Sequence, residues 1–143
     1  MAPIKIGIIG VDNCASSLLQ GIIYYRRTKH NVAIGILNCS INGYTPGDIE
    51  VVSAFDIDES KVDRDVHLAI FGRPNCSQRF LTHMPKTGVA IDCIRICKLA
   101  MDRNIGGVLE APSAYYCKYP PVQYNDDKAF TLLNDFISAQ IAA

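Results

Sequence analysis

The chain has 143 residues, 49% hydrophobic and 20% charged, a length and composition that fit one globular domain with a single core. Its formal net charge is zero and it has no basic cluster, which argues against nucleic acid as a partner. The apolar runs at 4–11 and 32–37 are too short to span a bilayer, and no cleavable leader is recognisable. We therefore expect a soluble, cytoplasmic protein with no membrane partner.

The chain begins with an apolar run from Ile4 to Gly10, which is typical of a strand buried on both faces. A helix is expected to open at Asn13 and to fade at Arg26 and Arg27. Its apolar positions recur at helical spacing: Ala15, Leu18, Leu19 and Ile22. A strand, a glycine turn and a helix are how a dinucleotide-binding unit starts, because the turn lets a diphosphate approach the amides of the helix N-terminus.

The glycine fingerprint of such a unit is incomplete here. Of its three glycines only Gly10 is in place, and Asp12 stands where the second is expected. The aspartate adds bulk and a negative charge near the expected phosphate. From this turn alone, nucleotide binding and its absence are equally expected.

The next segment is less regular, with a short strand expected at Val32 to Leu37 and a turn at Gly43 to Gly47. A second strand, Glu50 to Asp56, ends on an acid. In a nucleotide fold this acid binds the ribose hydroxyls, but Asp56 or Asp58 could equally cap a following helix at 59–71. The apolar face of that helix would be formed by Val62, Val66, Ala69 and Ile70; His67, on the same helix, is given no chemistry.

Two more helices are expected after the turns of residues 72–87. The first runs from Gly88 to Arg103. Its predicted buried side is formed by Ala90, Cys93, Ile94, Cys97 and Ala100 or Met101. Its predicted surface ion pairs are Asp92–Arg95 and Lys98–Asp102. The last is capped by Asn125 or Asp126, and its stripe is Ala129, Leu132, Leu133, Phe136 and Ile137.

Between these helices, the segment 104–121 is expected to be irregular, because Gly106 and Gly107 can end a helix and Pro112 can break one. Lys118 lies in this segment among tyrosines. It could hold a ligand, or it could simply extend into water above a packed loop. The six cysteines are spread along the chain, so buried free thiols are favoured over disulfides, and no metal site is expected.

Several motifs resemble the archaeal and actinobacterial type of myo-inositol-1-phosphate synthase. Residues 1–71 match the family's amino-terminal part through Ile6 to Gly21, Gly-Tyr-x-x-Gly-Asp-Ile-Glu (43–50) and Ala-Phe-Asp-Ile-Asp (54–58). Residues 85–143 match its carboxy-terminal part through Gly-Val-Ala-Ile-Asp-x-Ile-Arg (88–95), Asp-Arg-x-Ile-Gly-Gly (102–107) and Pro-Ser-Ala-Tyr-x-x-Lys-x-Pro-Pro (112–121). The family's central domain has no counterpart here; its place lies between about Phe71 and Met84.

The resemblance implies a cofactor site and a catalytic lysine. The family oxidises glucose 6-phosphate with NAD, closes the ring and reduces the product. Lys118 matches a lysine of its active site, whereas Thr82, His83 and Met84 stand where the family has an acid. The positions matching its NAD site are Gly10, Asp12, Asn13, Cys14, Ala15, Ser16 and Asp56.

The sequence therefore predicts one truncated NAD-binding domain over residues 1–143, of α/β class. We expect a truncated Rossmann-like, three-layer arrangement with a small, mostly parallel sheet and about four helices. Asp12 predicts weak or altered NAD binding. Two functions compete: a non-catalytic module that self-associates through an exposed sheet edge or helices and binds a nucleotide or sugar phosphate, or a reduced enzyme of inositol phosphate metabolism completed by a partner.

Overall fold

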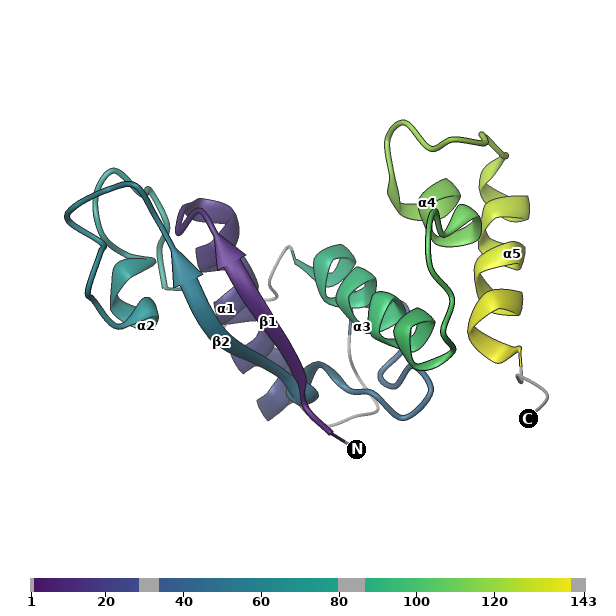
Figure 1. Ribbon diagram of the computed structural model, residues 1–143, viewed down its shortest axis with the longest axis horizontal. Helices are drawn as coiled ribbons and strands as arrows, with labels where there is room; N and C mark the ends of the chain where they lie inside the picture. The colour runs from purple at the N-terminus through teal and green to yellow at the C-terminus, as the bar shows by residue number, and fades with distance from the viewer. Residues whose placement is uncertain (1, 29–33, 80–86, 140–143) are drawn as a thin grey trace.

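The protein is described by a computed structural model over residues 2–28, 34–79 and 87–139. The sheet, α1 and α2 form one end of the molecule, α4 and α5 form the other, and α3 lies between them (Figure 1). In chain order the elements are β1 (Ile4–Ile9), α1 (Asn13–Arg27), the short 3-10 helix η1 (Pro46–Asp48), β2 (Ile49–Phe55), α2 (Val66–Ala69), α3 (Gly88–Asp102), α4 (Glu110–Tyr116) and α5 (Asp126–Ser138).

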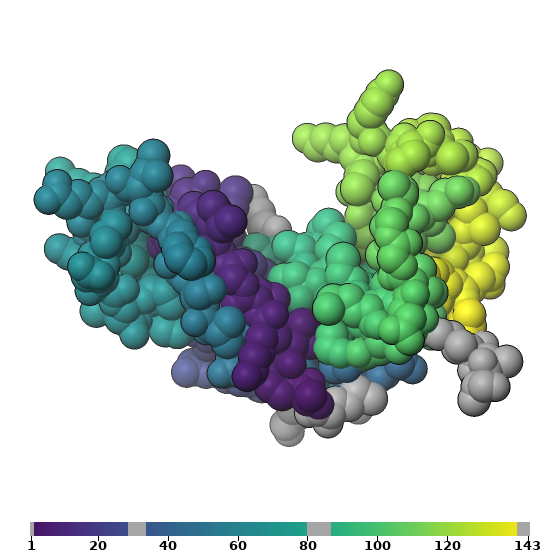
Figure 2. All heavy atoms as spheres, in the orientation of Figure 1, coloured from purple at the N-terminus to yellow at the C-terminus, as the bar shows by residue number. Residues whose placement is uncertain are grey.

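The two strands form a parallel sheet, which confirms the α/β class and the small parallel sheet. Ile4 pairs with Ile49, and the register shifts after Ile6, so that Val52 is an extra residue in β2. Ile4 and Ile8 are buried on the side of α1, whereas Ile9 is 91% exposed on the other side. Over the described residues the helices thus cover one face of the sheet, and in Figure 2 β1 lies at the surface toward the viewer.

Helix α1 has the predicted bounds and the predicted buried side. Asp12 is its N-cap, and Arg26 and Arg27 form its last turn, where positive charge is favourable. Two apolar clusters meet along it: Ile22 and Tyr25 pack with the amino ends of the strands, and Leu19 packs with the carboxyl end of β1 and with α2.

The predicted helix at 59–71 is wrong over most of its length, because only Val66–Ala69 is helical. Two aspartates start separate turns instead of one helix: Asp58 accepts a hydrogen bond from the Ser60 amide and Asp65 from the His67 amide. Asp63 between them has a φ of 59°. The strand expected at Val32 to Leu37 is also not formed where it is described, since residues 34–37 make turns and bends; residues 32 and 33 lie outside the described part.

Helix α3 has nearly the predicted bounds but buries a different face. Asp92 and Arg95, expected on the surface, are buried, whereas Ala90, Cys97 and Met101 are exposed. Apolar residues occur on more than one side of this helix, so a helical period alone does not select the face that is buried. The remaining buried members are Gly88, Ile91, Ile96, Leu99 and Ala100.

The segment 104–121, expected to be irregular, contains helix α4. Pro112 is the third residue of α4, where its missing N–H is no loss because the first amides of a helix have no partner within it. Asn104, rather than Gly106 or Gly107, ends α3: it has a φ of 54°, its amide donates to the Met101 carbonyl, and the Ile105 amide donates to the Ala100 carbonyl.

Helix α5 follows the prediction in its cap and in its buried side. The Asn125 side chain accepts a hydrogen bond from the Lys128 amide, and Ala129 and Leu133 are buried. Leu133 packs with Ile96 and Leu99 of α3, which joins the α4–α5 end to the centre. Among the described residues, no helix is both long and apolar enough to cross a membrane.

Candidate cofactor site

Residues 10–16, which we call the cofactor turn, lie at the carboxyl ends of both strands. Gly10 has a φ of 89°, and its amide donates to the Phe55 carbonyl at 2.8 Å. A left-handed φ of this kind favours glycine, which lets the chain turn from β1 into α1. The turn and the acid after β2 are therefore brought together as they are in a nucleotide-binding unit.

Asp12 uses the amides that would bind a phosphate. Its Oδ1 accepts hydrogen bonds from the Cys14 amide at 2.8 Å and from the Ala15 amide at 3.3 Å. An anion at a helix N-terminus is held by such amides and by the positive end of the helix dipole. Because a carboxylate of the chain already has this position, the turn does not fit a diphosphate group.

Two further predicted residues are already hydrogen-bonded within the chain, Asn13 to residues 76 and 77 and Ser16 to Gln20. The Asn13 Oδ1 accepts hydrogen bonds from the Cys76 amide at 2.9 Å and the Ser77 hydroxyl at 2.8 Å. Ser16 is fully buried and accepts a hydrogen bond from the Gln20 side chain at 3.2 Å. Of the other two residues of the turn, Ala15 is buried and Cys14 is exposed. Residues 76 and 77 thus lie over the start of α1.

Asp56, the predicted ribose-binding acid, follows β2 and is tied to the turn. Its carboxylate accepts hydrogen bonds from the Asp58 amide at 2.9 Å and the Val11 amide at 2.6 Å. These two amides, together with the charge of Lys61, lower the pKa of Asp56 below its ordinary value. The acid is therefore ionised at neutral pH and already has several donors.

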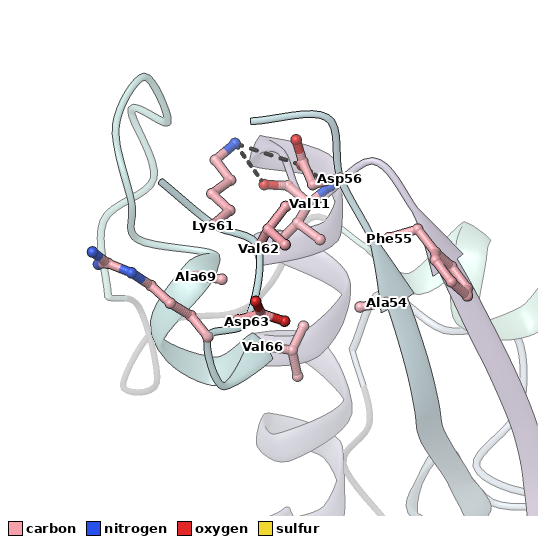
Figure 3. A pocket seen from close by; sticks show the side chains of 10 residues that line it. Val11, Ala54, Phe55, Asp56, Lys61, Val62, Asp63, Val66 and Ala69 are labelled. Carbon is pink, nitrogen blue, oxygen red and sulfur yellow. Dashed lines mark hydrogen bonds and ion pairs between the residues drawn. The ribbon is translucent and has the colours of Figure 1, made fainter. Parts of the chain in front are cut away.

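Lys61 completes this arrangement and was not predicted as a site residue. Its ammonium donates to the Val11 carbonyl at 2.9 Å and the Asn75 side chain at 3.0 Å, and it lies 3.7 Å from the Asp56 carboxylate. Figure 3 shows Lys61 and Asp56 converging on Val11 at the rim of a cavity of about 270 Å³. The signal in the sequence was a lysine five residues after the acid and three residues after the Ala-Phe-Asp-Ile-Asp motif (54–58).

A larger cavity of about 750 Å³ lies on the other side of the turn. It is lined by the outer side of β1, the start of α1 and the start of α3, including Gly10, Asp12 and Ala90. Lys118 lines neither cavity. It is exposed, two residues after α4, and α4 lies at the opposite end of the molecule from the strand ends (Figure 1). The structure brings Gly10, Asp12 and Asp56 together but not Lys118.

The cysteines of the chain are all free, as predicted, but none of the six is fully buried. Within the described residues, no group of three or more histidine, cysteine or acidic side chains is arranged to hold a metal ion.

Comparison with known proteins finds several inositol-3-phosphate synthases among the relatives of this chain. The chain is 38% identical over 89 residues to the inositol-3-phosphate synthase of Corynebacterium glutamicum and to that of Mycolicibacterium smegmatis, which is 62% of this chain and 24% of each relative. It is 38% identical over 73 residues to the inositol-3-phosphate synthase of Mycobacterium tuberculosis, 50% of this chain and 20% of that protein. No family model matches the chain. The aligned relatives confirm the resemblance inferred from the motifs, over about a quarter of their length.

Proposed function

We propose that this relative of the inositol-3-phosphate synthases is a non-catalytic module that associates with itself and binds nucleotides weakly. The observation that carries the proposal is the Asp12 carboxylate on the amides of Cys14 and Ala15. Those amides are the groups with which a helix N-terminus holds phosphate.

Binding of NAD requires its diphosphate to replace this carboxylate and then to remain beside it. Two like charges about 4 Å apart repel by about 1 kcal/mol in water, and by more where solvent is partly excluded. Asp56 is ionised and can still accept hydrogen bonds from ribose hydroxyls. We therefore expect the nucleoside part of a ligand to bind better than its phosphates, the reverse of an ordinary dinucleotide site.

The absence of catalysis is supported by the position of Lys118. A catalytic acid or base must come within hydrogen-bond reach of the atom it protonates or deprotonates, or reach it through one water. Lys118 follows α4, and α4 packs on α5 and α3 rather than on the strand ends that carry the cofactor turn. A single chain thus does not present this lysine to a ligand held at Gly10 and Asp56.

Self-association is supported by the outer side of the sheet. Ile9, Val52 and Phe55 are 91%, 54% and 62% exposed, and among the described residues each strand pairs only with the other. Exposed apolar side chains beside unpaired strand edges favour pairing with a second copy. A cyclic dimer would cover the exposed apolar side chains and the unpaired strand edges.

Calorimetric titration with NAD, NADH, adenosine and glucose 6-phosphate tests the nucleotide part of the proposal. We expect weak NAD binding that strengthens about tenfold in Asp12→Gly, because the competing charge is removed. Asp12→Asn is the matched control for charge, since asparagine also caps helices well. If wild-type protein binds NAD tightly and Asp12→Gly changes nothing, the proposal is wrong.

An assay for NAD-dependent turnover of glucose 6-phosphate by the purified chain tests whether the chain has catalytic activity of its own. Turnover by the purified chain, lost in Lys118→Ala, would contradict the non-catalytic proposal.

A further inference from the structure

A third cavity, of about 390 Å³, lies between α1 and the α2 region and shares no lining residue with the two cavities at the cofactor turn. We call it the Arg79 cavity. Its volume is within the range of sites that hold small molecules. Apolar side chains make up more than half of its lining, and the full set is Ile23, Leu68, Ile70 and Phe71 with the polar Gln20, His67 and Arg79.

The apolar side of the Arg79 cavity faces water. Leu68 is 64% exposed, and Ile23 and Phe71 are only partly buried. Behind them, Leu19 and Ile70 are buried in the cluster that joins α1 to α2. A ligand in this cavity would therefore remove apolar surface from water, which is favourable.

Arg79 gives the cavity a positive charge at a defined place. Its guanidinium carbon lies 5.1 Å from the centroid of the Phe71 ring, a cation–π contact that holds the charge against the apolar wall. Within residues 2–28, 34–79 and 87–139, no acidic side chain forms an ion pair with Arg79, and none lines the cavity. The arginine can therefore pair with an anion that enters the cavity.

The backbone that precedes Arg79 is fixed by α1. The Gln20 side-chain amide donates to the Gln78 carbonyl at 3.1 Å, and Gln20 is only 2% exposed. Arg79 is thus held at two points, through its neighbour Gln78 on α1 and through the ring of Phe71. A charge held in this way loses less side-chain freedom on binding than an arginine that extends into water.

We propose that the Arg79 cavity binds a small monocarboxylic acid with an apolar body. The carboxylate pairs with Arg79, whose planar guanidinium matches two carboxylate oxygens, and the His67 imidazole adds a further donor. The apolar body covers Ile23 and Leu68. A phosphate group fits less well, because it brings nearly two negative charges to a cavity with one permanent cation and a mostly apolar lining.

This inference does not depend on the proposed function, since neither the cofactor turn nor the outer side of the sheet takes part. An NMR titration of the wild-type chain with 3-phenylpropionate and with 4-methylpentanoate tests it. We expect saturable shifts in the amide signals of residues 67–71 and 79, and none in those of Gly10 and Asp12. The neutral analogue 3-phenylpropanamide should bind about tenfold more weakly than 3-phenylpropionate, because it lacks the charge that pairs with Arg79. Phenyl phosphate should also bind more weakly.

Three variants identify the residues responsible. Arg79→Met removes the charge and should weaken the binding of 3-phenylpropionate by about tenfold. Leu68→Asp adds a repelling carboxylate at an exposed position and should abolish binding. Arg73→Met is the matched control, because Arg73 is exposed and does not line the cavity, and it should bind as wild type does. Circular dichroism shows whether each variant is folded, and the comparison of ligands on the wild-type chain gives the answer if one is not.

The proposal is overturned if neither carboxylate gives saturable shifts, or if the neutral amide binds as tightly as 3-phenylpropionate. It is also overturned if Arg79→Met and Arg73→Met bind alike. Tighter binding of phenyl phosphate than of 3-phenylpropionate would show a phosphate site instead of a carboxylate site.

Discussion

Asp92 and Arg95, one turn apart on α3, form an ion pair whose side chains are 4% and 0% exposed. The Arg95 guanidinium also donates to the Cys39 and Tyr44 carbonyls, each at 3.2 Å, and the Asp92 carboxylate accepts from the Leu37 amide at 2.6 Å. The pair therefore holds the loop between residues 37 and 44 against α3 with charge-assisted hydrogen bonds.

Replacing Asp92 by alanine leaves the Arg95 charge buried and without its anion. Removing one partner of a buried pair costs about 3–5 kcal/mol, so we expect Asp92→Ala to lower the free energy of unfolding in urea by that amount. Lys98→Ala is the control, because it breaks the neighbouring pair with Asp102, which is more exposed and should contribute much less to stability. If both variants lower the free energy of unfolding equally, the buried pair does not stabilise the protein more than the exposed pair.

This pair shows what sequence reasoning could not supply. An acid and a base three residues apart on a helix are usually a surface pair, and the residues around Asp92 and Arg95 gave no contrary signal. What places them inside is the loop at 37–44, whose backbone groups need partners, and a loop of that kind cannot be matched to a helix from spacing alone.

A methyl group at Gly88 should be poorly tolerated. A Cβ built there would lie 1.4 Å from the Gly35 carbonyl oxygen, so backbone at the start of α3 would have to move away from that loop. We expect Gly88→Ala to destabilise the protein by about 1–3 kcal/mol in urea unfolding. Gly106→Ala is the matched change, since nothing lies within 4 Å of its added carbon, and it should be near neutral. If Gly88→Ala leaves the stability unchanged, Gly88 does not lie as close to Gly35 as described.

The end of α3 depends on Asn104, whose φ of 54° is one that glycine adopts most easily. Asn104→Gly should keep or slightly raise the melting temperature. Asn104→Ala should lower stability by about 1 kcal/mol, because a Cβ makes left-handed backbone unfavourable and alanine lacks the local hydrogen bonding of asparagine. If alanine and glycine behave alike at this position, the helix does not end as described.

Acid should weaken the link between Asp56 and the cofactor turn. The Asp58 and Val11 amides and the Lys61 charge lower the folded-state pKa of Asp56, so its contribution to stability is present above its unfolded-state pKa and is lost as the pH falls through the folded-state value. Unfolding midpoints measured from about pH 5 to about pH 2 should fall less steeply in Asp56→Asn than in wild type. Asp48 and Asp102 also have lowered pKa values, so wild type must be compared with the variant; equal slopes would contradict the assignment.

The outer side of the sheet should govern self-association. If a second copy covers Ile9 and Phe55, then Phe55→Lys should shift the protein toward monomer in light scattering across a range of concentrations, because a charge would be desolvated in the contact. Phe130→Lys, on α5 at the other end and 44% exposed, is the control and should leave the oligomeric state unchanged. If only Phe130→Lys abolishes the dimer, the two copies are in contact through α5 and not through the sheet.

The cofactor turn was the part of the site most open to prediction, because Gly10, Asp12 and Asp56 lie at the ends of elements that the apolar pattern locates well. The sequence analysis predicted only that the charge of Asp12 repels a bound phosphate. That its carboxylate also caps α1 depends on its side-chain direction, which the sequence does not fix. Lys118 was the opposite case: its motif matched, but which end of the fold it lies on depends on how α3 and α4 pack.

The division of the apolar interior into three clusters has a consequence for motion. The cluster around Ile96, Leu99 and Leu133 contains no residue of β1 or β2, and it reaches the rest of the molecule through α3 and through Ile41 of the loop at 37–44. Amide protons of α5 should therefore exchange with deuterium through fraying that leaves β1 and β2 protected, since sub-global opening follows such boundaries. The carboxy-terminal helices could then come loose and return while the cofactor turn keeps its shape.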